Sequence, residues 1–370
     1  MHGQRSILYI APTFLADRTR KQIRGVQVLD FQIIADLLQL GHRVCVPIER
    51  TWLARFREQL GPLAEHPGLE IVTLPHWRKP TWTTIAAAWK LRNRRFDAVI
   101  VGNVARGLLA GLSWMIRRRI SPRLVIQANA RPKGTFLRVL RHWPARVVAV
   151  SRHVAEGFPP QVGIERRAVD VYYGICNPND FFPAKPSSTG APIRLCMLGK
   201  LDTPLKGVDR VIEAFKRLPP DVRDRCELHL ASFPSPPAPE TIRSWGPGVV
   251  AHPWMPPQAV PELLRSMDAL VIASDSETYS QACVQAMLTG IPVISRDLPA
   301  LREKLESGAG LLFRTGEELG EAISRIVLNP DERNRMGEYA RSFALAHCVW
   351  RTEEFLDRYV FADEPRMTPA

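Results

Sequence analysis

The segment from Ser274 to Ser295, SDSETYSQACVQAMLTGIPVIS, leads from an apolar strand through a polar turn into a helix. The turn contains the carboxylate of Glu277, and the amide of Gln285 follows eight positions later on the helix. Ser280 is placed to cap this helix, whose first backbone N–H groups attract anions. The segment is therefore a candidate anion site, although Glu277 taken alone fits a solvated loop carboxylate equally well.

A second loop, LCMLGKLDTPLKG, has residues suited to binding phosphate. Its strand ends in Gly199, and Lys200, Lys206 and Gly207 follow before the next helix. Two ammonium groups beside a backbone that permits close approach could bind a diphosphate. A plain surface turn is the alternative reading. In VYYGICNPNDFFP, Gly174 needs either a positive φ or the absence of a side chain, and by itself indicates little.

The order of apolar runs predicts the elements that position these loops. Short apolar runs alternate with polar or amphipathic stretches, which is typical of a parallel α/β sheet. The first half contains SILYIAP, HRVCVPI, FDAVIVGN, RLVIQANA and RVVAVS as strands. After the segment FFPAKPSSTGAP the second half continues with the strands IRLCMLG, CELHLAS, GVVAHPW, ALVIAS and PVIS and the helices GVDRVIEAFKRL, AVPELLRSM and SQACVQAMLTG. With 370 residues, two doubly wound domains are expected, the second beginning near residue 190, with the chemistry in a cleft between them.

Composition and motifs exclude several classes of protein. A hydrophobic content of 45% and a charged content of 24% are those of a folded globular protein. The most apolar stretch, near 98–116, is interrupted by Asn103 and Arg106, and the N-terminus has no signal-peptide pattern, so a cytoplasmic protein is expected. The six cysteines lack paired spacing and are expected as buried thiols. No Walker loop, GxGxxG fingerprint or GxSxG elbow occurs.

The positive charge lies in the first half of the chain. The formal net charge is +13, and residues 1–182 have 28 Lys and Arg against 12 Asp and Glu, or +16, which leaves −3 for the remainder. Between Asp97 and Glu156 there is no acidic residue. The basic side chains accompany tryptophans there, namely Trp114 and Trp143 with Arg117, Arg118, Arg119, Arg131, Lys133, Arg138, Arg141 and Arg146. A solvated basic face is one reading, and an anionic surface or acceptor as partner is the other.

Taken in order, these segments resemble the retaining glycosyltransferases of family four, which have the GT-B fold. GKLDTPLKGVDRVIEAF resembles the family's phosphate loop, and SETYSQACVQAMLTGIPVI its Glu-x₇-Glu element. VYYGICNPNDFFP is similar to the family's interdomain motif, LLQLGHRVCV to its first helix and second strand, and HCVWRTEEFLDRYV to its returning last helix. The resemblance implies two Rossmann-like domains facing each other across a cleft. Their bounds are 1–182, joined by a helix of about 349–370, and 183–348.

The resemblance also implies roles for particular residues. Lys200 and Lys206 neutralise the donor diphosphate next to Gly199, and Glu277 meets hydroxyls of the donor sugar. The backbone amides of Tyr279 and Ser280 complete the phosphate site, and Thr278 belongs to the same donor site. Gln285 stands where the family binds the ribose. Trp254 is a candidate wall of the base site, and Arg24, Gly25 and Asn129 lie on the acceptor side. Cations and N–H groups then stabilise the charge on the leaving phosphate, and neither a metal nor a cofactor is expected.

Four residues depart from the family's pattern, which bears on the mechanism and not on the fold. Gln285 replaces an acid, Lys200 stands where many relatives have an arginine, Asn129 stands where the family often has a histidine, and Gly25 is a single glycine where a pair is common. A non-catalytic GT-B partner or scaffold therefore remains the alternative to an enzyme. Asp275-Ser-Glu277 also imitates the acidic pair that binds a divalent metal in the other glycosyltransferase fold.

The expected enzyme transfers a hexose-type sugar from a nucleoside diphosphate sugar to a lipid-linked or anionic glycan acceptor, in bacterial surface polysaccharide or glycolipid synthesis. HWRKPTWTTIAAAWKLRNRR and GLSWMIRRRIS combine tryptophans with basic residues. Trp favours the lipid headgroup boundary and Arg favours phosphate, so an anionic inner membrane surface is the expected partner. Packed tryptophans under solvated arginines are the alternative. Nucleic acid is not expected as a partner.

Overall fold

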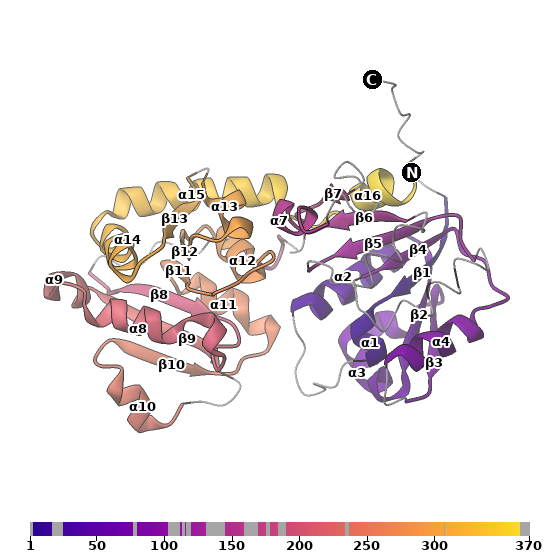
Figure 1. Ribbon diagram of the computed structural model, residues 1–370, viewed down its shortest axis with the longest axis horizontal. Coiled ribbons are helices and arrows are strands. Elements are labelled where there is room, and N and C mark those ends of the chain that lie inside the picture. The colour runs from indigo at the N-terminus through magenta and orange to yellow at the C-terminus, as the bar shows by residue number, and fades with distance from the viewer. Residues whose placement is uncertain are drawn as a thin grey trace, which may run out of the picture. The chain divides into compact units, whose positions relative to one another are not determined.

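The computed structural model describes residues 3–16, 25–76, 80–102, 112, 115, 120–130, 145–158, 169–174, 178–183, 190–233, 237–306 and 308–362. The chain divides into two compact units (Figure 1). Unit 1 comprises Met1–Tyr172 and Arg351–Ala370, and unit 2 comprises Tyr173–Trp350. The boundary expected at 182 thus lies ten residues after the change of unit, 182 − 172 = 10.

Unit 1 contains a parallel sheet of seven strands in the order β3-β2-β1-β4-β5-β6-β7. The strands are β1 Ser6–Ile10, β2 Arg43–Glu49, β3 Leu69–Leu74, β4 Ala98–Val101, β5 Leu124–Ala128, β6 Arg146–Ala149 and β7 Val169–Val171. The helices are α1 Pro12–Ala16, α2 Gly25–Gln39, α3 Leu53–Leu60, α4 Pro80–Lys90, α7 Arg152–Ala155 and α16 Thr352–Phe355, which continues as a π-helical turn, Leu356–Val360.

Unit 2 contains a parallel sheet of six strands in the order β10-β9-β8-β11-β12-β13. The strands are β8 Ile193–Leu198, β9 Cys226–Phe233, β10 Val249–Pro253, β11 Ala269–Ile272, β12 Val293–Arg296 and β13 Gly310–Phe313. The helices are α8 Val208–Lys216, α9 Pro220–Arg223, α10 Pro239–Ser244, α11 Val260–Arg265, α12 Gln281–Thr289, α13 Pro299–Leu305, α14 Gly316–Leu328 and α15 Pro330–His347. The ten strands named in the sequence analysis and the three helices named for the second half are confirmed.

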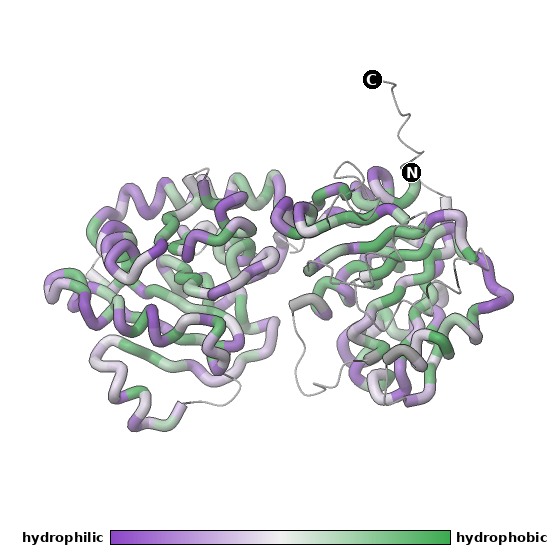
Figure 2. The backbone as a smooth tube through the Cα atoms, viewed as in Figure 1, coloured by the Kyte–Doolittle hydropathy of each residue, from purple (hydrophilic) through white to green (hydrophobic). Residues whose placement is uncertain are grey.

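Apolar residues line the strands of each sheet, and the hydrophilic ones lie mainly on the covering helices and loops (Figure 2). In unit 2, α8 packs with α14 and α12 packs with α15. Helix α8 directs Val208, Val211, Ile212 and Phe215 into the core, the spacing of an amphipathic helix. The five described cysteines are buried and unpaired. Among the residues that the structure describes, no helix has both the length and the apolar character needed to cross a membrane.

A buried carboxylate joins three elements of unit 1. Asp30 on α2 is 1% exposed and accepts hydrogen bonds from the hydroxyl of Tyr9 on β1 at 2.7 Å and from that of Thr13 on α1 at 3.1 Å. A Cβ on Gly102 would lie 2.6 Å from the Tyr9 hydroxyl oxygen and even closer to the carboxylate. Desolvation by burial raises the pKa of Asp30 to about 7, although both hydrogen bonds oppose the shift.

Because of the Asp30 carboxyl group, we expect the free energy of unfolding to decrease as pH rises from about 4 to about 7. The folded pKa lies above the ordinary value of 3.8, so the folded state keeps a proton that the unfolded chain releases. The contribution approaches about 1.4 kcal/mol per pH unit. Asp30→Asn should remove it, as urea unfolding of both proteins at pH 5, 6 and 7 would measure. Identical pH slopes for the two proteins would contradict this account.

Candidate active site

The candidate site lies at the carboxyl ends of β8 and β11, which are neighbours in the unit 2 sheet. Nζ of Lys206 lies 2.8 Å from Oε1 of Glu277, and the hydroxyl of Ser274 donates to the same oxygen at 2.8 Å. Ser280 and Lys206 border one small recess with Glu277. Parallel neighbouring strands end at the same edge, so two loops that are about seventy residues apart in sequence meet here.

Gly207 sets the approach of the lysine loop to β11. It has φ +67°, and a Cβ there would lie 2.7 Å from Nη1 of Arg210 and still closer to the carbonyl oxygen of Ala273. Only glycine satisfies both conditions. Gly199 has φ +138°, a conformation that favours glycine, although a Cβ there would make only an ordinary contact of 3.7 Å with Cε of Lys206. Gly207 therefore lets the loop of Lys206 approach the end of β11, where Glu277 follows.

The Lys206–Glu277 pair is partly shielded from water. The side chain of Lys206 is 30% exposed and that of Glu277 is 13% exposed. An ion pair in this setting is screened less than a surface pair, yet both groups remain within reach of a ligand. An acid, a cation and the first N–H groups of α12 are thus adjacent, a set that can hold sugar hydroxyls and phosphate oxygens.

The other predicted donor residues lie on several elements of unit 2 and differ in exposure. The side chain of Lys200 is 59% exposed, and its nearest carboxylate partner is Asp202 at 3.9 Å. Trp254 follows β10 and is 40% exposed. Gln285 is half-buried on the second turn of α12, and Thr278 is half-buried in the turn after β11. The structure therefore pairs only one of the two predicted lysines with Glu277.

The expectation that Ser280 caps α12 through its side chain is wrong. Ser280 occupies the N-cap position, but its side chain makes no capping hydrogen bond. Its backbone has φ 65° and ψ 93°, whereas a capping serine adopts the extended conformation that brings Oγ to the N2 or N3 amide. The amides at the start of α12 therefore lack this intramolecular acceptor.

The predicted acceptor-side residues belong to unit 1. Arg24 lies outside the described residues, and Gly25 is the first residue of α2. Asn129 follows β5 and donates from Nδ2 to the carbonyl oxygen of Gly102 at 3.0 Å, while its buried Oδ1 has no hydrogen-bond partner. Gly174, at the start of unit 2, is buried.

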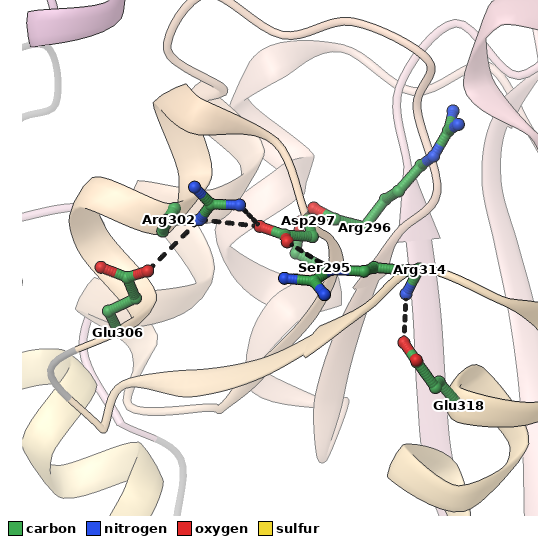
Figure 3. Close-up of polar contacts among 7 residues, drawn as sticks. All are labelled: Ser295, Arg296, Asp297, Arg302, Glu306, Arg314 and Glu318. Carbon is green, nitrogen blue, oxygen red and sulfur yellow. Dashed lines mark hydrogen bonds and ion pairs between the residues drawn. The ribbon is translucent and has the colours of Figure 1, made fainter.

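Two carboxylate networks that the sequence analysis did not anticipate support the same edge of the sheet. Asp275 accepts from Nη2 of Arg210 at 3.0 Å and contacts Arg296, and the hydrogen bond from Arg210 is the main reason that its pKa is lowered. Asp297 lies between the guanidinium groups of Arg302 and Arg314, at 2.9 Å from Nε of each (Figure 3). The only sequence signal for these networks is an acid after each strand, which does not identify its arginine.

These pairings bear on the metal alternative. Asp275 is held by two arginines, and Glu277 by Lys206 and Ser274. Each carboxylate thus already faces a cation in the structure. Within the described ranges, no group of three or more His, Cys, Asp or Glu side chains could hold a metal ion.

Comparison with known proteins agrees with this geometry. Residues 179–343 match the family model of glycosyl transferases group 1. Over 165 residues the chain is 26% identical to the MMP alpha-(1->4)-mannosyltransferase of Mycolicibacterium hassiacum, a match that covers 43% of this chain and 40% of that relative. The chain therefore matches less than half the length of that curated relative.

Solved structures match nearly the whole chain. HepE of Anabaena, crystallised in complex with UDP, superposes with a TM-score of 0.71 at 17% identity, over 93% of this chain and 96% of that one. WaaG, a glycosyltransferase involved in lipopolysaccharide biosynthesis, superposes with a TM-score of 0.69 at 16% identity, over 96% of this chain and 100% of that one. Residues 179–343, within unit 2, are thus similar to group 1 glycosyltransferases, and the whole chain has the GT-B fold expected from the sequence.

Proposed function

We propose that the protein transfers a hexose from a nucleoside diphosphate sugar to an acceptor, with retention of configuration and without a divalent metal. The observation that carries this proposal is the Lys206–Glu277 pair beside the N-terminus of α12. When donor binds, Lys206 turns to the diphosphate and Glu277 accepts from sugar hydroxyls. The lysine and the helix N–H groups offset the charge that arrives on the leaving phosphate.

The proposal is tested by incubating purified protein with UDP-, GDP- and ADP-sugars and following nucleotide release and the anomer of the product by NMR. Release from one donor, unchanged by EDTA, is the expected result. Complete loss in EDTA that manganese restores would mean that the carboxylates bind metal instead. The alternative function, a non-catalytic scaffold, is favoured by Gln285 and Asn129 and would give no release from any donor.

Gln285→Glu is expected to tighten nucleotide binding or leave it unchanged. A carboxylate accepts from both ribose hydroxyls, whereas the amide offers one acceptor oxygen and a donating NH₂. The restored charge-assisted bond contributes about 1 kcal/mol, roughly a fivefold change in Kd. Calorimetric titration with the nucleotide of the active donor measures it. Weakening by more than tenfold would show that this position does not bind ribose.

We further propose that unit 1 binds an anionic membrane surface, where a lipid-linked acceptor would be reached. On α4, Trp82, Ile85 and Trp89 are spaced for one helical face and are 55%, 37% and 62% exposed. The guanidinium of Arg92 lies 4.3 Å from the ring centroid of Trp89. Aromatic rings at the headgroup level with basic side chains beside them are typical of interfacial helices. Arg117, Arg118 and Arg119 lie outside the described residues.

Sedimentation with liposomes tests this surface. The protein should bind phosphatidylglycerol vesicles but not phosphatidylcholine vesicles, and 1 M salt should release it because the screening length shortens to about 3 Å. Replacing Trp82 and Trp89 with Ser should weaken binding at least tenfold. Tyr339→Ser, which removes an aromatic ring 46% exposed on α15 of unit 2, is the control and should change nothing. Failure of the protein to bind either kind of vesicle would favour a soluble acceptor.

A further inference from the structure

Ser280, at the start of α12, has a backbone conformation that residues other than glycine rarely adopt. Among the described residues it is the one non-glycine residue with positive φ. Such a conformation is strained and persists only where the surrounding structure enforces it. The Ser280 side chain does not hold the turn, since it makes no capping hydrogen bond. The restraint must come from its neighbours.

The preceding residue, Tyr279, is anchored at both its ring and its hydroxyl. Its side chain is buried, with the residue 3% exposed, and its hydroxyl donates to the carbonyl oxygen of Tyr173. The hydroxyl of Tyr173 donates in turn to Oε2 of Glu303 on α13 at 2.8 Å. Tyr279 therefore connects the turn before α12 to α13.

The face of the Tyr279 ring is occupied by a buried cation. Lys304, also on α13, is 1% exposed, and its Nζ lies 4.4 Å from the ring centroid of Tyr279. The same nitrogen donates to the carbonyl oxygen of Ala300 at 2.6 Å. Burial lowers the pKa of Lys304, which shows how unfavourable this environment is for an ammonium group. A buried ammonium group is destabilising unless its surroundings bind it, and here the carbonyl oxygen of Ala300 and the ring of Tyr279 do so.

Helix α13 is itself held firmly enough to act as a support. Arg302 on this helix donates to Asp297, which also accepts from Arg314, and contacts Glu306 one turn later (Figure 3). The position of Lys304 is thus tied to the ends of β12 and β13.

We propose that Tyr279 and Lys304 form a buried clamp that holds Ser280 in its strained conformation and so directs the first N–H groups of α12 toward the donor diphosphate. The inference rests on the proposed function, because it takes the start of α12 to be the diphosphate site. Both are positioning residues, since their side chains are almost fully buried. The clamp acts through the backbone of Ser280, which borders the recess with Lys206 and Glu277.

The test measures binding of UDP, GDP and ADP to Lys304→Met and to Tyr279→Phe, each with and without Ser280→Gly. Lys304→Met keeps most of the side-chain volume and removes the charge, and should weaken the tightest nucleotide at least tenfold. Tyr279→Phe keeps the ring but loses the hydrogen bond to Tyr173, and should weaken nucleotide binding severalfold. Glycine adopts positive φ freely, so Ser280→Gly should restore affinity in both variants to within about threefold. It should not rescue Lys206→Ala, whose lost contact is with the ligand itself.

Wild-type affinity in Lys304→Met, or weakening that Ser280→Gly does not relieve, would overturn the clamp in favour of ordinary packing. If Lys304→Met does not fold, the Tyr279→Phe pair decides by the same criterion. If the wild-type protein binds none of the three nucleotides, the proposed function fails and the clamp is judged by hydrogen exchange. Faster exchange of the amides of 279–283 in Lys304→Met, reversed by Ser280→Gly, would support it, and unchanged exchange would overturn it.

Discussion

Glu277→Gln and Lys206→Ala are each expected to lower the turnover of sugar transfer at least a hundredfold while the protein stays folded. Lys206→Ala removes a preorganised cation from the site of charge development, and Glu277→Gln removes the charged acceptor of the sugar hydroxyls. The loss of one such interaction typically costs about 3 kcal/mol of transition-state stabilisation. Folding should persist because the pair lies at the carboxyl ends of β8 and β11, where water can solvate the remaining partner. Turnover is measured with the active donor, and folding by thermal unfolding.

The chain provides a matched control on a neighbouring helix. Glu213 and Lys216 on α8 also form an acid–lysine pair, at 3.7 Å, but their side chains are 57% and 40% exposed. Glu213→Gln and Lys216→Ala change the same chemical groups and should leave turnover within twofold. Near-normal turnover in both Glu277→Gln and Lys206→Ala would remove the basis for the assigned site.

Gly207→Ala is expected to lower turnover about a hundredfold and to decrease the free energy of unfolding by about 2–4 kcal/mol. Left-handed backbone costs an alanine about 1 kcal/mol, and overpacking adds about 1–3 kcal/mol. The added methyl would overlap the carbonyl oxygen of Ala273 and Nη1 of Arg210, so the loop must retreat. Lys206, the preceding residue, would then lose its contact with Glu277.

Gly246→Ala separates the two causes. Gly246 also belongs to unit 2 and has φ +93°, but no heavy atom lies within 4 Å of the Cβ position. It should therefore show only the backbone cost, about 1 kcal/mol, with normal turnover. Urea unfolding and the transfer assay give both quantities for each variant. Equal destabilisation by the two changes, with turnover retained in Gly207→Ala, would show that the close approach to β11 is unimportant.

The sequence by itself determined the interior of both sheets. Buried parallel strands are apolar on both faces, so β1, β4 and β11 contain short continuous apolar runs that can be recognised without tertiary information. The strands absent from the sequence analysis were β3, β7 and β13, and each lies at the edge of its sheet. An edge strand pairs on one side only and is often short or partly exposed, so its apolar signal is weak.

The sequence also identified which charged residues lie at the site, but not which of them form ion pairs with one another. It placed Lys200 and Lys206 in one loop and Glu277 after a later strand, but only the sheet order makes β8 and β11 neighbours. The close approach at Gly207 then selects Lys206 and leaves Lys200 exposed. A charged side chain cannot reveal its partner from local sequence, because an ion pair depends on distances set by chain segments far apart.

Tertiary structure alone decided the conformation of the turn at Ser280 and the burial of Lys304. Local preference predicts a serine cap in extended conformation, and a lysine in PALREKL is expected to be solvated. The structure instead gives Ser280 a positive φ and places Lys304 against the ring of Tyr279. The contacts of Tyr279 with Lys304 and with the carbonyl oxygen of Tyr173 join segments far apart in the chain, so local sequence does not reveal them.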